Sequence, residues 1–309
     1  MSKTALLFAG QGAQVVGMGK DLAEKYPSAK AWFDRANAAL GYDLAGVCFN
    51  GPEAALTKTE NAQPGIFLAS WVCFQLLREQ SPNLKFDATA GLSLGEFTAL
   101  TAAGAMSFED GLRVVRQRGK FMQEACDVTK GGMAAIIGLD EALTRAVCAE
   151  AGVVLANLNC PGQLVISGEA GKITKACELA KAKGAKRALP LPVAGAYHSP
   201  LMASAQPKLA AELASVKLAA SVVPVFSNVT AEAHGAPVEI SVRLVEQVCA
   251  SVLWETSMRA LLAQGFTRFI ELGPGTALSG FMKRIDKTAT MLNVADAPSL
   301  EAAVKALSV

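Results

Sequence analysis

Short apolar runs alternate with longer amphipathic segments along most of the chain. Apolar runs at 5–9 and 86–91 are typical of buried strands, and each leads into a glycine turn. Helical spacing of apolar residues is present in longer segments, at 27–40, 66–79, 94–104 and 108–124. Strands that alternate with helices in this way predict a parallel sheet covered by helices on both faces.

The middle of the chain has another order of elements. Between 130 and 197 the pattern predicts strand, helix, strand, strand, helix and strand, with one helix opened by Asp140 and the other ended by Gly184. This βαββαβ order is typical of ferredoxin-like domains. Strand-like runs in 224–230 and 265–275, a helix around 241–251 and helical stretches after Gly275 return to the first pattern. We therefore expect a small subdomain, 130–197, inserted into a larger α/β domain made of 1–129 and 198–309.

Composition and charge narrow the classes of function. Of 309 residues, 51% are hydrophobic and 18% charged, which allows a large core and excludes a disordered chain. The net charge is +2 without long basic or acidic runs, so we expect neither nucleic acid nor a membrane surface as a partner. The apolar helix candidate at 66–77 is too short to span a bilayer, and the N-terminus does not resemble a signal peptide.

The seven cysteines are scattered, odd in number and without a C-x-x-C pair. This pattern favours reduced core thiols of a cytoplasmic protein over a disulfide framework, and no cysteine stands in a catalytic motif. We expect no metal site and no bound cofactor, and a monomer.

One serine lies between two glycines in Gly91-Leu-Ser93-Leu-Gly95, after a predicted strand and before a predicted helix. In such a turn the glycines allow neighbouring chain to pass close by, and the hydroxyl stands at the carboxyl edge of the sheet beside the free N–H groups of the helix. The alternative is a glycine-rich turn in which the serine has no role.

A reactive serine hydroxyl needs a base, and the chain has two histidines. His198 follows the last strand of the small unit among small residues, where two domains would meet and form a cleft. His234 lies in a polar loop with glycine and proline, and we expect it to be solvated. His198 is therefore the predicted base, although no acidic residue near a strand end is apparent to orient it.

Several stretches, in this order along the chain, resemble the malonyl-CoA–acyl carrier protein transacylases of fatty acid synthesis. They are "LLFAGQGAQ", "ENAQPGIFLAS", "GLSLGEFTAL", "VVRQRGKFMQEA", "NLNCPGQLVISG", "AYHSPLM", "SNVT", "QVCASVLW" and "ELGPG". The resemblance covers nearly the whole chain. It implies an α/β-hydrolase-like core with a parallel sheet and an inserted ferredoxin-like subdomain.

The resemblance also implies roles for individual residues. Ser93 would be the nucleophile and His198 the general base and acid, with the side-chain carbonyl of Gln247 accepting from the histidine. The backbone N–H groups of Gln11 and Leu94 would form the oxyanion hole. The acyl pocket would hold Arg118, which pairs with the malonyl carboxylate, together with Met122 and Asn159. Spacing alone does not separate Arg118 from Arg116 on the same predicted helix; the similarity of "QRG" to the family motif favours Arg118.

Three positions depart from the family pattern: Leu92 stands where histidine is frequent, Tyr197 where phenylalanine is frequent, and Ser251 where proline is frequent. None of these departures removes a catalytic group.

The implied reaction moves a malonyl group from malonyl-CoA to the phosphopantetheine thiol of acyl carrier protein through a malonyl-serine. An acidic carrier protein would be steered by basic residues near the cleft, for which we consider Lys186 and Arg187, and Lys283, Arg284 and Lys287. Three alternatives remain: an acyltransferase that loads a polyketide carrier protein, a serine hydrolase that releases free acid, and a catalytically silent docking module.

Overall fold

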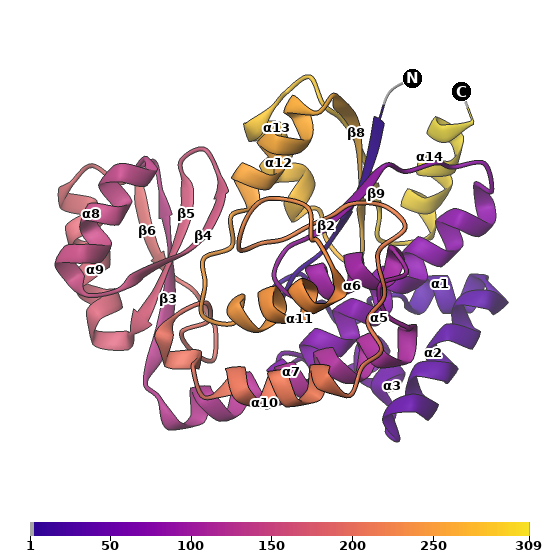
Figure 1. Ribbon diagram of the computed structural model, residues 1–309, viewed down its shortest axis with the longest axis horizontal. Coiled ribbons are helices and arrows are strands. Elements are labelled where there is room, and N and C mark those ends of the chain that lie inside the picture. The colour runs from indigo at the N-terminus through magenta and orange to yellow at the C-terminus, as the bar shows by residue number, and fades with distance from the viewer. Residues whose placement is uncertain (1–2, 309) are drawn as a thin grey trace.

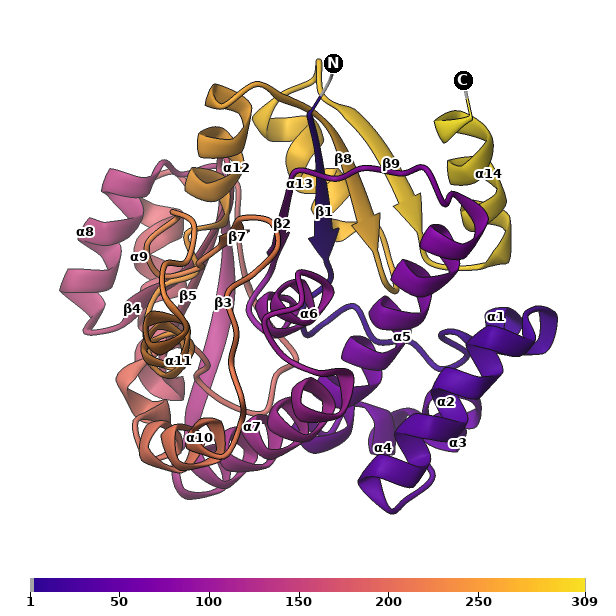
Figure 2. The same ribbon diagram turned by 45° about the vertical axis from the view of Figure 1, so that its right-hand side comes forward.

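The computed structural model describes residues 3–308 and contains two separate sheets (Figures 1 and 2). The larger sheet has five parallel strands in the order β7-β2-β1-β8-β9. These strands are β7 (Val225–Phe226), β2 (Ala88–Gly91), β1 (Lys3–Phe8), β8 (Phe266–Leu272) and β9 (Thr290–Val294). The predicted parallel sheet is therefore confirmed.

The central strand β1 is buried on both faces, which explains its unbroken apolar run. Leu6 and Phe8 belong to one hydrophobic cluster, and Ala5 and Leu7 belong to another on the opposite face. The first cluster includes α5 (Thr59–Gln80) and α6 (Gly95–Ala102); the second includes α12 (Trp254–Ala263) and α13 (Ala277–Ile285). Helices thus cover both faces of the parallel sheet, as the alternation of elements predicts.

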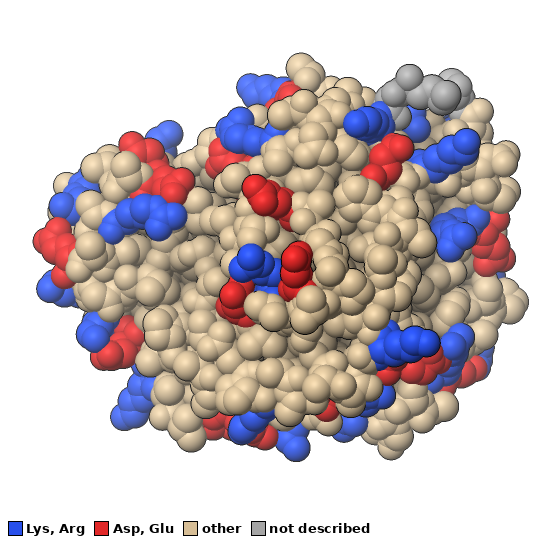
Figure 3. Space-filling view, viewed as in Figure 1, with Lys and Arg blue, Asp and Glu red and all other residues tan. Residues whose placement is uncertain are grey.

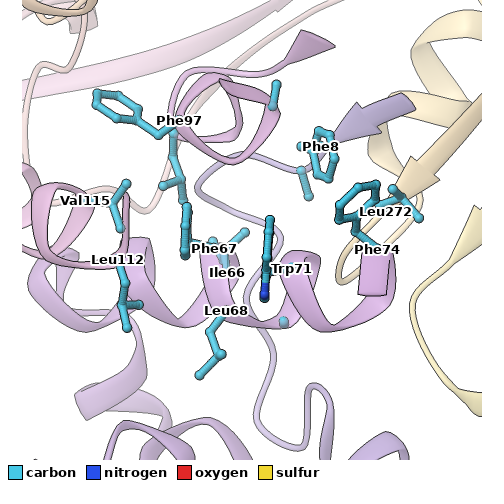
Figure 4. Close-up of a cluster of buried hydrophobic side chains, with 14 of the residues drawn as sticks. Phe8, Ile66, Phe67, Leu68, Trp71, Phe74, Phe97, Leu112, Val115 and Leu272 are labelled. Atoms are coloured by element: carbon cyan, nitrogen blue, oxygen red, sulfur yellow. The ribbon is translucent and has the colours of Figure 1, made fainter. Parts of the chain in front are cut away.

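Aromatic side chains of α5 fill the first cluster (Figure 4). The rings of Phe8 and Phe74 meet edge to face, with centroids 6.1 Å apart, and Trp71 packs against Phe74. The other helices on the core are α1 (Lys20–Lys25), α2 (Pro27–Leu40), α3 (Leu44–Asn50), α4 (Glu53–Leu56), α7 (Phe108–Val128), α10 (Ala205–Ala214), α11 (Pro237–Glu246) and α14 (Ala297–Leu307), and a 3₁₀ turn spans Pro200–Met202. None of the helices described is long and apolar enough to cross a membrane.

The smaller sheet is antiparallel, with the order β4-β5-β3-β6. Its strands are β3 (Gly131–Ile137), β4 (Val154–Cys160), β5 (Gln163–Glu169) and β6 (Arg187–Pro190), and α8 (Glu141–Ala151) and α9 (Ala170–Ala182) cover the face that points away from the parallel sheet (Figure 1). These elements share a hydrophobic cluster of their own. The predicted order of strand and helix in this segment is confirmed.

Main-chain hydrogen bonds join the antiparallel sheet to the segment that follows Gln247. Val252 donates to Ala156 O at 2.8 Å, and Leu158 donates to Val252 O at 2.9 Å. Ser251, which stands where the family often has proline, adds a side-chain bond of 2.5 Å to Leu155 O. The two parts of the molecule are therefore connected close to a predicted site residue.

Some boundaries differ from the sequence predictions. Helix α5 begins at Thr59, seven residues before the predicted start at 66, and continues through Pro64, which lies inside the helix. The sequence pattern placed the start after this proline, because proline is disfavoured in a helix interior. The helix expected around 241–251 spans Pro237–Glu246. Strand β9 was not anticipated as a separate element; it is a mostly half-buried edge strand whose sequence, TMLNV, does not alternate regularly between apolar and polar residues.

Candidate active site

Ser93 lies on the turn between β2 and α6, with the left-handed backbone angle φ of 52°. A Cβ on Gly91 would lie 1.9 Å from the carbonyl carbon of Gly95, and one on Gly95 would lie 2.2 Å from Phe8 O of β1. Both glycines are thus required by close backbone approach. A strand–turn–helix with a serine in left-handed backbone is the geometry in which a serine hydroxyl is exposed at the sheet edge.

His198 stands at hydrogen-bond distance from the serine: its Nε2 is 2.8 Å from Ser93 Oγ. Its Nδ1 is 2.8 Å from the main-chain oxygen of Gln247. Because a carbonyl oxygen only accepts, Nδ1 carries the proton and Nε2 offers its lone pair to the serine hydroxyl. Burial, and then the nearby Arg118 charge, lowers the pKa of His198 to about 4, so the ring is neutral at pH 7.

The structure corrects the role that the sequence predicts for the Gln247 side chain. The main-chain carbonyl of Gln247, not its side-chain carbonyl, accepts from the histidine. The side-chain Oε1 accepts from Arg118 Nη2 at 3.0 Å, and Nε2 donates to Ser93 O at 3.0 Å and to Glu96 Oε2 at 2.7 Å. The sequence could not separate these possibilities, because they depend on the backbone direction where α11 ends.

Arg118 projects from α7 to the serine and is 1% exposed. Its Nη2 donates to Ser93 Oγ at 3.1 Å and to Gln247 Oε1, and its Nη1 donates to Gln63 Oε1 at 2.8 Å. All three acceptors are neutral groups. Burial lowers the pKa of Arg118 to about 10, an effect opposed by the charge of Glu96, so the guanidinium remains protonated at neutral pH.

The neighbouring Arg116 points elsewhere. It donates to Leu40 O at 3.2 Å and lies over the ring of Tyr42. Geometry therefore separates the two arginines that sequence spacing left equivalent, and places Arg118 at the serine.

A cleft of about 640 Å³ opens beside Ser93 and His198. Its walls come from the loop after β1, the turn after β2, and strands of the antiparallel sheet, so it lies where the two sheets face each other. The lining includes Gln11, Leu92, Met122, Asn159 and Tyr197. The hydroxyl of Tyr197 lies 2.7 Å from Thr59 Oγ1, and Asn159 Oδ1 is buried with no hydrogen-bond partner among residues 3–308.

The other side of the serine turn holds residues that the sequence analysis missed. Asn228 Oδ1 accepts from the Ser93 N–H at 2.6 Å, and its Nδ2 donates to Gly91 O at 2.8 Å. Glu96, in the first turn of α6, accepts from Asn228 N, from Gln247 Nε2 and from His234 Nε2. The signal was present, since Asn228 lies in "SNVT" and Glu96 directly follows Gly95, but neither has a chemical pattern that spacing alone reveals.

The expectation that His234 is solvated was wrong. Its side chain and that of Glu96 have no exposed surface, and His234 Nε2 lies 2.7 Å from Glu96 Oε1. The loop folds back on β7, where His234 N donates to Val225 O at 2.8 Å. A loop rich in glycine and proline thus carries a buried side chain, because its partner comes from a distant part of the sequence.

The five basic residues considered for docking are exposed, and none lines the cleft among the residues described. The two clusters converge at one place. The stem of Lys186 packs beside Gly138, whose N–H donates to Gly162 O at 2.9 Å, and Arg284 donates to Pro161 O at 2.9 Å and to Gln163 Oε1 at 3.0 Å. Elsewhere, on the face shown in Figure 3, charges of both signs are scattered.

All seven cysteines are free, and six of them are buried. Burial raises the pKa of Cys48 and Cys73 to about 12, so these thiols are poor nucleophiles at neutral pH. The Ser93 hydroxyl, by contrast, lies 2.8 Å from His198 Nε2.

A strained serine in contact with a neutral histidine, beside a buried guanidinium, defines a serine acyltransferase or hydrolase type of site. A protein-family model described as "Acyl transferase domain" matches residues 5–301. The malonyl CoA-acyl carrier protein transacylase of Bacillus subtilis is 46% identical over 99% of this chain and 98% of its own length. The chain belongs to the acyl transferase domain family.

Solved structures agree with this assignment. The malonyl CoA-acyl carrier protein transacylase of Coxiella burnetii superposes with a TM-score of 0.96 at 36% identity, covering 100% of this chain and 98% of that one. A malonyl-transacylase solved in complex with its type II PKS acyl-carrier protein superposes with a TM-score of 0.95 at 38% identity, covering 99% of this chain and 100% of that one.

Proposed function

We propose that this protein transfers the malonyl group of malonyl-CoA to the phosphopantetheine thiol of acyl carrier protein, with Ser93 as the intermediate carrier, and so supplies extender units for fatty acid synthesis. A relative that is 46% identical over 99% of this chain bears the name of this activity. The observation that carries the proposal is the buried Arg118 guanidinium, 3.1 Å from Ser93 Oγ and held by neutral acceptors. It leaves a positive charge free for an acyl group that ends in a carboxylate.

The reaction proceeds in two exchanges. Ser93 Oγ attacks the thioester carbon while His198 Nε2 takes the hydroxyl proton; the carbon–sulfur bond then breaks, and the proton passes to the sulfur of CoA. In the second exchange the carrier thiol gives its proton to His198 and its sulfur attacks the serine ester, and the proton returns to Ser93 Oγ. A thiol is a good leaving group, so a histidine with a neutral partner is basic enough.

The backbone N–H groups of Gln11 and Leu94 stabilise the oxyanion of each tetrahedral intermediate. Leu94 stands at the N-terminus of α6, where helical N–H groups are free, and Gln11 lies in the loop after β1 that lines the cleft. The close contact of Gly95 with β1 brings these two segments together.

Arg118 selects the acyl group by pairing with the malonyl carboxylate through its planar fork. Met122 and Asn159 line the space for the acyl chain, and the unpartnered Asn159 Oδ1 is available to a donor of the substrate. Gln63, which was not anticipated, holds the second arm of the guanidinium.

The carrier protein approaches over the exposed basic surface formed by Lys186, Arg187, Lys283 and Arg284, called the basic rim below. A structural neighbour solved with its carrier protein supports such a partner. Convergence of the two clusters on one rim supports attraction of an acidic surface. No bound cofactor is needed, and a monomeric state and a cytoplasmic location stay predictions.

The finer description of the fold is also a proposal. The serine turn between strand and helix supports an α/β-hydrolase-like core made of 1–129 and 198–309. The βαββαβ order, with both helices on one face of an antiparallel sheet, supports a ferredoxin-like subdomain at 130–197.

The experiment is intact mass spectrometry of the protein mixed with malonyl-CoA, followed by carrier protein in its phosphopantetheine form. We expect one malonyl adduct on Ser93, its loss when the carrier is added, and malonyl-carrier as product. The Ser93→Ala variant should form no adduct. An adduct that persists in that variant would place the nucleophile elsewhere, and free malonate as the main product would show a hydrolase.

The structural neighbour in complex with a type II PKS carrier keeps a second function open, the loading of a polyketide carrier protein. The same reaction applies to both. Rates with a fatty acid carrier and a polyketide carrier, measured side by side, separate them.

A further inference from the structure

A buried carboxylate and a buried imidazole pair behind the serine turn, on the side away from the cleft. Glu96 Oε1 accepts from His234 Nε2 at 2.7 Å, and both side chains have no exposed surface. Neither residue takes part in the proton transfers proposed above. Burying a carboxylate away from solvent costs free energy unless hydrogen-bond donors satisfy both of its oxygens. The donors around Glu96 therefore decide how its carboxylate is held.

The second carboxylate oxygen of Glu96 accepts hydrogen bonds from two residues that contact Ser93. Glu96 Oε2 accepts from Gln247 Nε2 at 2.7 Å and from Asn228 N at 2.9 Å. Asn228 in turn accepts from the Ser93 N–H, so the carboxylate is connected to the serine backbone. It is also connected to Arg118, because Gln247 Oε1 is the acceptor for Arg118 Nη2.

The direction of the Gln247 amide is decisive for Arg118. An amide presents an oxygen on one side and an NH₂ group on the other. Because Glu96 Oε2 and Ser93 O both accept from Nε2, the oxygen must face the guanidinium. A reversed amide would bring an NH₂ group against a buried cation and would displace Arg118 from its place at Ser93.

We propose that Glu96 and His234 form a positioning pair for acyl selection: His234 fixes the carboxylate of Glu96, which sets the Gln247 amide so that its oxygen supports Arg118. The inference rests on the proposed role of Arg118 toward the malonyl carboxylate. Without the His234 donor, Glu96 Oε1 has no hydrogen-bond partner among residues 3–308, and the carboxylate turns to share the remaining donors. The orientation of the Gln247 amide is then no longer fixed.

Because the pair positions Arg118, its loss should lower the transfer of malonyl more than the transfer of acetyl, which has no carboxylate to pair with the guanidinium. The measured quantity is the ratio of kcat/KM for malonyl-CoA to kcat/KM for acetyl-CoA, with the full chain and carrier protein as acceptor. In His234→Leu the ratio should fall about tenfold, the effect expected when a hydrogen bond that supports a charged group is lost. In His234→Gln, whose amide keeps a donor near the Nε2 position, the ratio should return to within about twofold of wild type.

Two further variants separate orientation from charge and from general loss of packing. In Glu96→Gln the amide oxygen can accept from Gln247 and Asn228 while its NH₂ donates to His234, so the ratio should hold within about threefold. The matched control is Thr101→Val, which removes a buried 2.8 Å hydrogen bond to Phe97 O from the same helix without touching the pair. Its ratio should stay unchanged.

The outcomes are distinct. An equal fall for both substrates in His234→Leu means that the pair only supports the fold, and overturns the inference. A tenfold fall of the ratio in Glu96→Gln assigns the effect to charge and also overturns it. If His234→Leu shows no cooperative thermal transition, His234→Asn, whose shorter amide does not reach Glu96, takes its place with the same expectation. Failure of the proposed function itself appears earlier, as a wild-type protein without malonyl on Ser93.

Discussion

The two histidines lie on opposite sides of the turn at Ser93, and their hydrogen-bond partners differ in charge. His198 faces the cleft and donates to the main-chain carbonyl of Gln247, whereas His234 lies behind the turn and contacts the carboxylate of Glu96. The chain therefore has a buried carboxylate–imidazole pair behind the serine turn, but the imidazole at hydrogen-bond distance from Ser93 Oγ is the other one. Among the residues described, His198 has the neutral main-chain oxygen of Gln247 as the partner of its Nδ1.

The difference in charge between the partners of His198 and His234 suits a different task on each side of the serine turn. A carboxylate bound to His198 would raise the pKa of the ring, which amide hydrolysis needs and thioester exchange does not. A carboxylate in direct contact with Arg118 would also compete with an incoming malonyl group for the guanidinium. On the cleft side neutral groups keep the cation available, and on the other side the carboxylate satisfies buried donors.

The largest expected effect comes from replacing each histidine in turn. His198→Ala should slow malonylation of Ser93 by about 10²–10⁴-fold, the usual contribution of a positioned general base. His234→Ala should slow it much less, because the proton acceptor remains. Rapid-quench mass spectrometry gives both rates, and a larger loss from His234 than from His198 would reverse the assignment.

Arg118→Ala comes next in size. Removing one partner of a buried charge pair typically costs about 2–5 kcal/mol, and malonyl transfer should fall accordingly. Activity toward acetyl-CoA should rise relative to malonyl-CoA, since no unpaired cation remains in the pocket. Arg118→Lys should also be poor, because lysine lacks the planar fork. Steady-state kcat/KM for both thioesters is the measurement, and an unchanged ratio in Arg118→Ala would exclude Arg118 as the carboxylate partner.

Gln247→Ala keeps the main-chain carbonyl that holds His198 and removes the amide that supports Arg118 and Ser93. We therefore expect weaker malonyl-CoA binding as well as slower turnover, by roughly tenfold, the scale of one hydrogen bond to a charged group. Calorimetric binding to Ser93→Ala and to Ser93→Ala/Gln247→Ala separates binding from chemistry. Equal affinities would mean that the side chain acts on His198 after all.

The smallest effect is expected at the basic rim. Lys186→Glu combined with Arg187→Glu should raise the KM for carrier protein several-fold, more than the KM for malonyl-CoA, because exposed charges act mainly on the approach of a charged partner. Lys20→Glu with Lys30→Glu, on exposed parts of α1 and α2, is a matched control for net charge. An equal effect of both pairs would remove the rim from the docking surface.

Much of the fold could be predicted from apolar periodicity, because β1, β2 and the long helices bury unbroken or regularly spaced apolar residues. Strand β9 could not, since an edge strand with half-buried positions has little pattern. In the site, the glycines at 91 and 95 locate the serine, because their steric role is local. The partners of His198 and His234 come from positions 49 and 138 residues away, and contacts of this range depend on how the chain folds.

The hydrogen bonds of Val252 to Ala156 and Leu158 have a consequence for engineering. They tie β4 to the chain only five residues beyond the carbonyl that holds His198. The antiparallel sheet is thus not an accessory that can be trimmed or exchanged freely between relatives, as surface loops often can. A chimaera that grafts another small sheet onto this core must also carry the matching segment after Gln247, so that the main-chain carbonyl keeps its contact with the His198 imidazole.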